Sequence, residues 1–376
     1  MVRSGARRPD SPSTVSDLQR SPNASAATAS GLPATLAAMD RSLARHAALL
    51  VVVFVATLVL LAGGWALVGQ GGANSGSPRS SSLAGSGGPL PIASASPGAS
   101  SSASGPVGSP AQDVVLTGAG DIADCSSTGA AQTSDLLVNQ SGTIFTAGDN
   151  AYENGSDAEF AACYQPTWGR VKDRTLPVPG ENDYQRSGAA GYLAYFGAAA
   201  APDGTTWYST DLGTWHVIFL DSNCAKIGGC TAASPQGRWL AADLAAHAEV
   251  RCTLAIWHHP RFSSGEHGDN VDVGSFWTQL VAAHADLVIN GHDHDYERFA
   301  PQDAAGTEDR KVGLREFVVG TGGAGLRGFT SEAANSELRL AGVWGVMRLT
   351  LHPANYDWEF LPTAGQITDS GSALCH

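Results

Sequence analysis

This chain of 376 residues lacks several common signatures, and each absence removes a class of function. Lysine occurs only at Lys172, Lys226 and Lys311, and the formal net charge is -13, so no basic stripe is present to bind nucleic acid. No CxxC spacing occurs that would favour thiolate metal sites, and no GxSxG occurs that would favour a serine hydrolase. The glycine-rich run Gly320–Gly325 is not followed by GK[ST], which excludes a P-loop.

The N-terminal part of the chain has little from which to build a core. Residues 1–46 are rich in Ser, Ala, Pro and Arg, and we expect them to be disordered. The segment Ala47–Val68 is almost wholly apolar and uncharged, which predicts a transmembrane anchor over 47–69, since about 20 apolar residues span a bilayer. Residues 70–111, of Gly, Ser, Pro and Ala, predict a flexible linker, and the length of 112–376 predicts one folded domain.

The distribution of arginine predicts how the anchor is oriented. Six arginines precede the apolar segment, and only Arg79 follows it before Arg170. The positive-inside rule then predicts a single-pass protein of the cell membrane, with a cytoplasmic N-terminus and an extracytoplasmic folded domain. The alternative is a cleaved signal peptide, but its apolar region is usually only about 7–15 residues long and its leader is short.

Six cysteines all lie in the predicted outer domain. An even number on the oxidising side of a membrane predicts disulfides. Cys224 and Cys230 are close enough in sequence to close a small loop. Although six cysteines allow about 15 connectivities, our interpretation also pairs Cys125 with Cys163 and Cys252 with Cys375.

Apolar runs alternate with alanine- and leucine-rich stretches of helical spacing. The predicted strands are 114–117, 143–146, 215–220, 253–257, 287–289, 317–319, 346–351 and 356–360. The predicted helices are 130–139, 236–246 and 276–283. Strands interleaved with helices, followed by β-rich closing segments, indicate an α/β domain with two packed sheets and helices outside them.

Polar residues cluster where five of the apolar runs end. The clusters are GDIAD at 120–124, GDNAY at 148–152, GEND at 180–183, WHHP at 257–260 and GHDHDYER at 291–298. Ligands of open α/β sheets gather beyond the carboxyl ends of the strands, so these clusters predict one site. In the last cluster we expect an extended chain that aims His292 and His294, two positions apart, at the same spot.

These five blocks, in this order, resemble those of the calcineurin-like metallophosphoesterases, in particular the purple acid phosphatase-type branch. The segment Val318–Gly323 is similar to the same branch. The resemblance implies a four-layer α/β sandwich, in which two β-sheets are flanked by helices. It also implies a hydrolase with a dinuclear metal centre, which holds Fe together with Zn, Mn or Fe.

The resemblance also implies how the metals are held. Asp121, Asp149, Tyr152 and His294 would hold the first metal, where a tyrosinate favours Fe(III). Asp149 would bridge to a second metal that is held by a residue of the 180–183 block and two histidines, His258 and His292. A bridging carboxylate keeps two cations roughly 3.5–4 Å apart, so that both can neutralise phosphate charge. The alternative for Tyr152 is an aromatic side chain that merely packs beside the site.

The GEND block departs from the family pattern, which is GNHD or GNHE. Aligned without a gap, Glu181 takes the place of the metal-binding Asn, and Asn182 takes the place of the His that assists catalysis. If the loop is shifted, Asn182 is the ligand instead. In both arrangements the usual transition-state histidine is missing.

Three further residues are candidates around the predicted centre. His267, nine residues after His258, lies where purple phosphatases often carry a histidine facing the leaving group, and its imidazole could protonate a departing alkoxide. The alternative for His267 is a solvent-facing loop histidine. His259 and Arg298 are expected to support the ligands rather than to bind metal.

The sequence therefore predicts a metal-dependent, acid phosphatase-like phosphoesterase. A metal-bound hydroxide would attack phosphorus in line, and the substrate would be a small phosphate monoester. One alternative is a phosphodiesterase or nucleotidase that uses the same metals. Another is a surface protein that binds metal or phosphate with little turnover, since the usual histidine of the GEND block is missing.

Overall fold

The computed structural model describes residues 112–366 and 369–376. The predicted disordered segment, membrane anchor and linker, 1–46, 47–69 and 70–111, lie outside the described residues. Within the described ranges, no helix is both long and apolar enough to cross a membrane.

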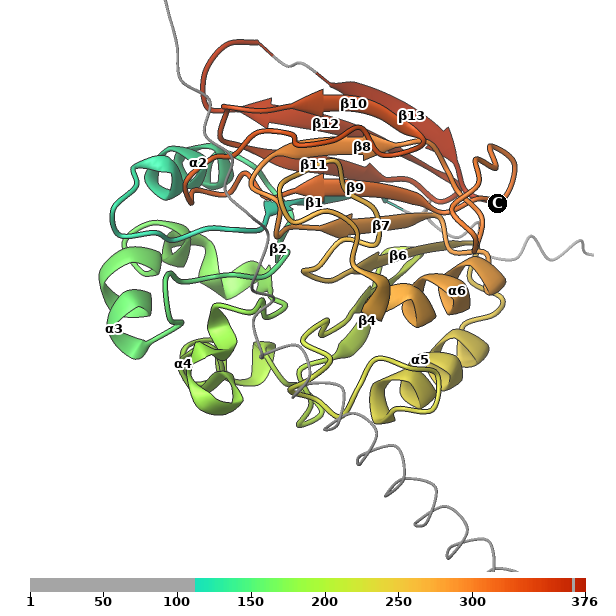
Figure 1. The fold of residues 1–376 in the computed structure, drawn as a ribbon, viewed down its shortest axis with the longest axis horizontal. Helices are drawn as coiled ribbons and strands as arrows, with labels where there is room; N and C mark the ends of the chain where they lie inside the picture. The colour runs from blue at the N-terminus through green and yellow to red at the C-terminus, as the bar shows by residue number, and fades with distance from the viewer. Residues whose placement is uncertain (1–111, 367–368) are drawn as a thin grey trace, which may run out of the picture. The chain divides into compact units, whose positions relative to one another are not determined.

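The first of two sheets has six strands in the order β13-β12-β11-β1-β2-β3 (Figure 1). Its strands are β1 (Val114–Ala119), β2 (Thr143–Thr146), β3 (Thr175–Leu176), β11 (Gly345–Leu351), β12 (Asn355–Pro362) and β13 (Ser370–Leu374). β1, β2 and β3 run parallel, whereas β11, β12 and β13 add to β1 in antiparallel fashion. The parallel half therefore places three carboxyl ends on one edge of the sheet.

The second sheet has seven strands in the order β10-β8-β9-β7-β6-β5-β4. Its strands are β4 (Tyr208–Leu212), β5 (Trp215–Phe219), β6 (Cys252–Ile256), β7 (Leu287–Asn290), β8 (Tyr296–Phe299), β9 (Arg315–Val319) and β10 (Ser336–Leu340). The central strands β5, β6, β7 and β9 are parallel. β4 pairs antiparallel with β5, β8 pairs antiparallel with β9, and β10 pairs antiparallel with β8.

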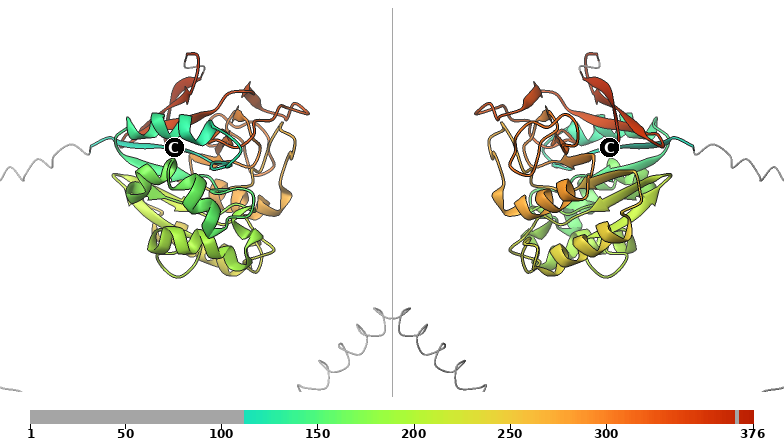
Figure 2. Two further views of the ribbon diagram at one scale, coloured as in Figure 1. Left: turned by 90° about the vertical axis from the view of Figure 1, so that its left-hand side faces the viewer. Right: turned by 90° about the vertical axis from the view of Figure 1, so that its right-hand side faces the viewer.

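Helices flank the two sheets. They are α2 (Gly129–Val138), α3 (Asp157–Glu159), α4 (Ala190–Phe196), α5 (Pro235–Ala246) and α6 (Gly274–Ala282). Short helical turns are η1 (Phe160–Tyr164), η2 (Trp168–Arg174), η3 (Asp183–Gln185), η4 (Ser187–Ala189), η5 (Gly197–Ala199) and η6 (Val271–Val273). The two views in Figure 2 show the green helices α3 and α4 on one side of the described domain and the yellow and orange α5 and α6 on the other.

The alternation of side chains along the strands builds two separate apolar layers. In β6, Leu254 and Ile256 belong to the large core shared with the six-stranded sheet. Ala255 and the following Trp257 belong to a second core, which includes Leu240 of α5. Because successive side chains of a strand point to opposite faces, the seven-stranded sheet is covered on both sides. The predicted arrangement of two sheets with helices outside is thus confirmed.

Most predicted elements are confirmed to within a few residues, but five strands and two α-helices were missed. The eight predicted strands correspond to β1, β2, β5, β6, β7, β9, β11 and β12, and the three predicted helices to α2, α5 and α6. The missed elements are β3, β4, β8, β10, β13, α3 and α4. β10 and β13 lie at sheet edges and contain partly or fully exposed residues, so they present no apolar run.

All three predicted disulfides are confirmed. Cys125–Cys163, Cys224–Cys230 and Cys252–Cys375 have Cα–Cα distances of 5.2, 5.0 and 5.4 Å, within the usual range for this bond. Cys252 is the first residue of β6 and Cys375 follows β13, so the last bridge joins the two sheets.

Candidate metal centre

The five predicted blocks follow the carboxyl ends of parallel strands from both sheets. Asp121 follows β1, Asp149 follows β2, His258 follows β6 and His292 follows β7. The 180–183 block follows the short β3 through three residues. The strand ends thus supply the side chains from five separate segments, as the sequence predicts.

The backbone turns sharply at three of these positions. Asp121, Asp149 and His292 have positive φ angles of 60°, 50° and 73°. The left-handed region costs a non-glycine residue roughly 1–2 kcal/mol, and such strain concentrates at functional sites. The segment from His292 to Asp295 is a bend. Our expectation of an extended chain there was wrong.

Three side chains meet at the phenol of Tyr152 and form a group of four residues with it. Its hydroxyl donates to Asp121 Oδ1 at 2.7 Å and to Asp149 Oδ2 at 3.0 Å. It lies 3.3 Å from His294 Nε2, which is itself 3.3 Å from Asp121 Oδ1. These are the four residues that the family resemblance assigns to one metal.

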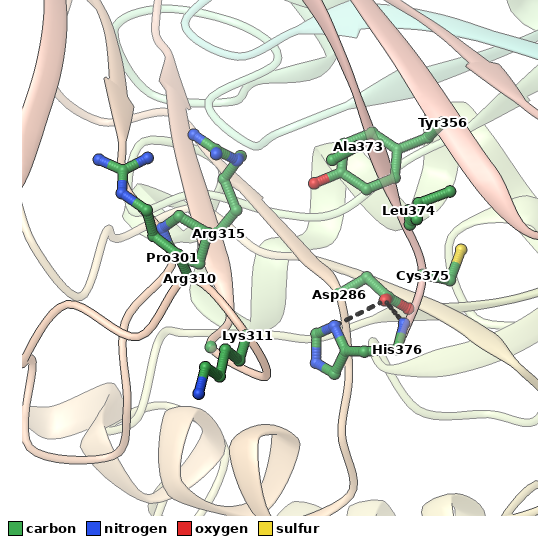
Figure 3. Close-up of a pocket in the computed structure, with 11 residues that line it drawn as sticks. Asp286, Pro301, Arg310, Lys311, Arg315, Tyr356, Ala373, Leu374, Cys375 and His376 are labelled. Carbon is green, nitrogen blue, oxygen red and sulfur yellow. Dashed lines mark hydrogen bonds and ion pairs between the residues drawn. The ribbon is translucent and has the colours of Figure 1, made fainter.

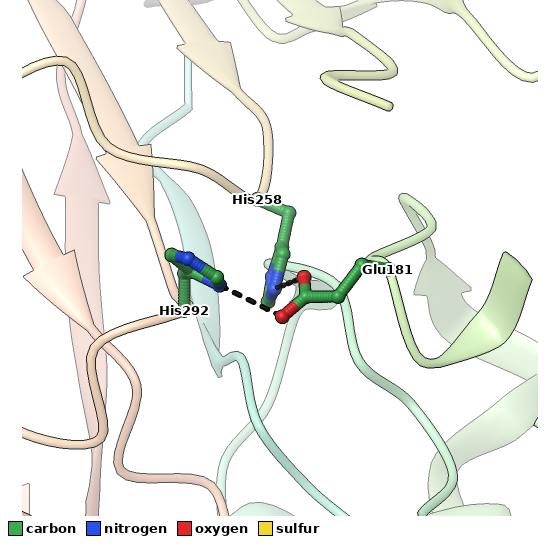
Figure 4. A group of neighbouring side chains, drawn as sticks. All are labelled: Glu181, His258 and His292. Atoms are coloured by element: carbon green, nitrogen blue, oxygen red, sulfur yellow. Dashed lines mark ion pairs between the residues drawn. The ribbon is translucent and has the colours of Figure 1, made fainter. Parts of the chain in front are cut away.

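A second group forms around Glu181 (Figure 4). Figure 4 shows the carboxylate of Glu181 directed at the rings of His258 and His292, each from a different segment. Glu181 Oε2 lies 2.7 Å from His258 Nε2, and Oε1 lies 3.0 Å from His292 Nδ1. His258 Nε2 is also 3.6 Å from Asp149 Oδ2, which connects the two groups. His292 and His294 thus serve different groups instead of one spot.

The donor set fits a cation. His258 Nδ1 lies 2.7 Å from the carbonyl of Ala147, and His294 Nδ1 lies 2.6 Å from that of Gly325, so each ring presents Nε2 to the carboxylates. Among the described residues, no hydrogen-bond partner satisfies Glu181 Oε2, His258 Nε2 or His292 Nδ1, although these atoms lie close together. Buried atoms that converge without hydrogen bonds are arranged as ligands around a metal ion.

The pKa shifts of the candidate ligands also favour a metal site. Burial raises the pKa of Asp149 to about 6, although His258 acts against this. Burial opposes a charge on His258, yet Asp149 and Glu181 raise the pKa of its imidazole well above the usual value. A proton on His258 and a cation would compete for the same carboxylates, so metal binding would lower the proton occupancy of this ring. Burial, followed by Asp121 and Asp149, raises the pKa of Tyr152 well above its usual value.

Comparison with solved structures identifies the fold. The chain superimposes on a purple acid phosphatase from yellow lupin seeds with a TM-score of 0.58 and 18% identity, covering 70% of this chain and 54% of that one. It matches a dimetal phosphatase from Danio rerio with a TM-score of 0.50 and 11% identity, over 71% of this chain and 100% of that one. The described domain has the calcineurin-like metallophosphoesterase fold.

Further comparisons limit what the structural likeness shows about the function of this chain. The Plasmodium protein GAP50, an anchor in the inner membrane complex, shares the fold with a TM-score of 0.56 and 15% identity, over 70% of this chain and 89% of that one. Two uncharacterized proteins of Mycobacterium tuberculosis are 31% identical over 157 residues, which is 36% of this chain. The match spans only 30% of the length of these relatives. No family model matches the chain.

Within this metallophosphoesterase fold, the GEND block separates the roles of its two central residues. Glu181 carries the carboxylate that meets the two histidines. The backbone N–H of Asn182 donates to Asp149 Oδ1 at 2.8 Å, and its side-chain amide contacts Asp149 Oδ2. The geometry therefore favours the alignment without a gap, in which Glu181 is the ligand candidate and Asn182 contacts the bridging carboxylate.

Asp183, the last residue of the block, fixes the loop. Its side chain is fully buried, and Oδ2 accepts from Gly180 N at 3.0 Å, Asn150 N at 3.1 Å and Asn150 Nδ2 at 2.9 Å. At Gly180 a Cβ atom would lie 2.1 Å from Asp149 Oδ1, so only glycine allows this approach. The block is thereby held against the loop that carries Asp149.

Two of the three other predicted residues lie at the centre. His259 Nε2 is 3.4 Å from Glu181 Oε2, and His259 Nδ1 is 2.8 Å from Ser222 Oγ. The ring of His267 stacks on that of His292 with a centroid distance of 4.3 Å. Arg298 lies elsewhere, because its guanidinium pairs with Asp369 Oδ2 at 2.9 Å and with Glu337.

Sequence reasoning missed the residues that hold the loop around His267. The buried carboxylate of Asp293 accepts from His267 N at 2.8 Å and from the hydroxyl of Ser263. The buried Glu316 accepts from Arg261 N at 2.7 Å and from Phe262 N at 3.1 Å. No sequence pattern marks these roles, since each joins segments that are distant along the chain.

A cavity of about 480 Å³ does not belong to the centre (Figure 3). It is lined by Asp286, which precedes β7, and by Arg315 and His376 among others, whereas His292 follows the other end of β7. None of the candidate metal ligands lines it.

A second histidine–carboxylate cluster is unsuited to metal. Asp211, His216 and His247 approach one another between β4, β5 and the end of α5. The rings of His216 and His247 stack in near-parallel planes, 3.6 Å apart, so their in-plane lone pairs do not converge. Both ring nitrogens of His216 face carboxylates, at 3.0 Å for Asp211 and 2.8 Å for Asp243.

Proposed function

We propose that this protein hydrolyses phosphate monoesters at a dinuclear metal centre. The observation that carries the proposal is the convergence of buried carboxylate and imidazole atoms from five strand ends, several of them without a hydrogen-bond partner in the described domain. The likeness to phosphatases supports phosphoester hydrolysis as the general reaction.

The proposed ligands divide into two sets that share Asp149. Asp121, Tyr152 and His294 contact one another and would hold the first metal with Asp149. The second metal would be held by the Glu181 group, which is Glu181, His258 and His292. Oxygen and imidazole donors suit Fe, Zn and Mn, and we propose Fe with Zn, Mn or Fe. When bound, the cations would neutralise phosphate charge and make water more acidic.

The chain's own groups would position the reaction. The carbonyls of Ala147 and Gly325 fix the rings of His258 and His294, so that each Nε2 faces the ligand carboxylates. Asn182 holds Asp149 through two contacts and would supply an amide near the phosphoryl group. His267, stacked on His292, would give a proton to the leaving alkoxide from Nδ1, since Arg327 contacts its Nε2.

We also propose that the catalytic domain lies outside the cell membrane, anchored by the segment 47–69. All six cysteines are paired, which is consistent with an oxidising compartment. Protease treatment of intact cells tests the location, since the domain should be released from the outside. Protection of the domain until the cells are lysed would overturn the proposal.

A substrate panel tests the reaction. The full-length protein, purified in detergent with its metals, is assayed with p-nitrophenyl phosphate, the bis ester and nucleotides. We expect the monoester to give the highest kcat/KM. A preference for the bis ester or for nucleotides would favour a phosphodiesterase or nucleotidase instead.

The replacement of the usual histidine by Asn182 favours one further candidate function. A site without that histidine retains the metal ligands but loses one group that assists the chemistry. A surface protein that binds metal or phosphate with little turnover fits this arrangement. It predicts measurable binding of inorganic phosphate and no hydrolysis of any substrate in the panel.

A further inference from the structure

A cationic side chain that no predicted block contains lies next to the candidate centre. Arg327 follows the glycine-rich segment after β9, and its Nη1 contacts His267 Nε2. The nearest recorded carboxylate is that of Glu266, 3.7 Å from Arg327 Nε. With a side chain that is 34% exposed, Arg327 is accessible to a ligand and only weakly paired.

The backbone fixes Arg327 beside one proposed metal ligand, and a side-chain contact places it near a second. Its N–H donates to the carbonyl of His294 at 3.0 Å, and the carbonyl of Gly325 receives His294 Nδ1 at 2.6 Å. The contact partner His267 stacks on His292. Arg327 thus lies beside His294 of the Tyr152 group and, through His267, beside His292 of the Glu181 group.

The chemistry of the substrate calls for a positive charge at this place. A phosphate monoester carries more negative charge than a diester, because one more of its oxygens is free of an ester bond. Asn182, which contacts Asp149, is neutral and does not meet this charge. A guanidinium is always charged and donates to phosphate oxygens in a fixed planar geometry.

We propose that Arg327 binds a peripheral oxygen of the substrate's phosphoryl group and makes the centre select phosphomonoesters over diesters. This inference rests on the proposed phosphoesterase function. In a diester the corresponding oxygen is esterified, so it offers the guanidinium no full charge.

Three variants of the full-length protein test the proposal. Arg327→Ala removes the charge, Arg327→Lys keeps it without the planar geometry, and Arg339→Ala is the matched control. Arg339 has a similarly exposed side chain, at 27%, and pairs with Glu332 away from the centre. Metal content and thermal unfolding are measured for each variant, to show that fold and metals are retained.

We expect Arg327→Ala to lower kcat/KM for p-nitrophenyl phosphate about 10- to 100-fold and to change that for the bis ester less than about threefold. The Lys variant should fall between Ala and wild type, and Arg339→Ala should match wild type. Equal losses for both substrates, or no loss for the monoester, would overturn the proposal.

A phosphate-binding experiment tests the Arg327 proposal independently of the proposed hydrolytic function. Inorganic phosphate is titrated into the metal-loaded proteins by calorimetry, and Arg327→Ala should weaken its binding about tenfold or more. If wild type hydrolyses nothing yet binds phosphate through Arg327, the proposed function fails and the assignment of Arg327 as a phosphate ligand stands. If wild type binds no phosphate, or the variant binds it equally well, the Arg327 proposal fails.

Discussion

At the scale of single residues, the centre depends on which member of the 180–183 block reaches the metal. Glu181 lies between two imidazoles, whereas Asn182 contacts only the carboxylate of Asp149 among the proposed ligands. A carboxylate at this position, instead of the amide that the resemblance implies, adds negative charge to the second metal set. The charge would strengthen cation binding and make the bound cation a weaker Lewis acid.

Two alanine variants test this division of roles. We expect Glu181→Ala to reduce bound metal from about two ions per chain to about one, because it removes an anionic ligand of one set. Asn182→Ala should retain about two ions, because it leaves every proposed ligand atom in place. Elemental analysis of the purified proteins measures both. The reverse pattern would show that Asn182 is the ligand.

At the scale of elements, His216 connects β4, β5 and α5. Its ring, buried on β5, lies between Asp211 of β4 and Asp243 of α5. Burial opposes a charge on the ring, but the hydrogen bonds to Asp243 and Asp211 raise the pKa of His216 above its usual value. When it is protonated, the ring therefore acts as a clamp between a helix and an edge strand.

The sign of the pKa shift gives a pH-dependent prediction. The pKa of His216 is higher in the folded state than in the unfolded state. The stabilisation that protonated His216 contributes is therefore complete below the ordinary histidine pKa, and it is lost as pH rises through the folded-state pKa. We expect His216→Gln to lower the free energy of unfolding by roughly 1 kcal/mol near pH 5.5 and by less near pH 9. Urea denaturation at both pH values measures this. A loss that is equal at both pH values, or larger near pH 9, would contradict the clamp.

The elements that sequence reasoning found and missed differ in where their side chains are buried. β6 and β7 are buried at every position, and their apolar runs stand out in the sequence. β10 is partly exposed throughout, and in β13 exposed residues alternate with partly exposed ones. β8 follows the histidines directly and contains Glu297 and Arg298, so its polar residues conceal a strand whose partners are distant in sequence.

At the scale of the described domain, the disulfides differ in how much chain they close. Cys252 and Cys375 are 123 residues apart, whereas Cys224 and Cys230 are 6 apart. If a disulfide restricts the unfolded chain, replacing both cysteines of the long pair by alanine should cost about 4–5 kcal/mol, and of the short pair roughly 2 kcal/mol. Urea denaturation of the two double variants compares them. An equal or larger cost for the short pair would contradict this order.

The sequence predicts which blocks form the site but not how each block is held. The metal-ligand residue types in five ordered blocks are visible in the sequence, since the chemistry restricts them to Asp, Glu, Asn, Tyr and His. The left-handed turn at His292 and the loop anchors Asp293 and Glu316 are not visible, because they arise from packing between distant segments. Arg327 is hidden for the same reason, since only the fold places it beside His267.

The metal content of the full-length protein and of Asp149→Asn tests the central claim most directly. Elemental analysis after purification without chelators should find about two transition-metal ions per wild-type chain and clearly fewer in the variant, because Asp149 is shared by both sets. Hydrolysis of p-nitrophenyl phosphate by the variant should be at least about 100-fold slower than by wild type. A wild-type protein without bound metal, and a variant with unchanged hydrolysis, would contradict the account.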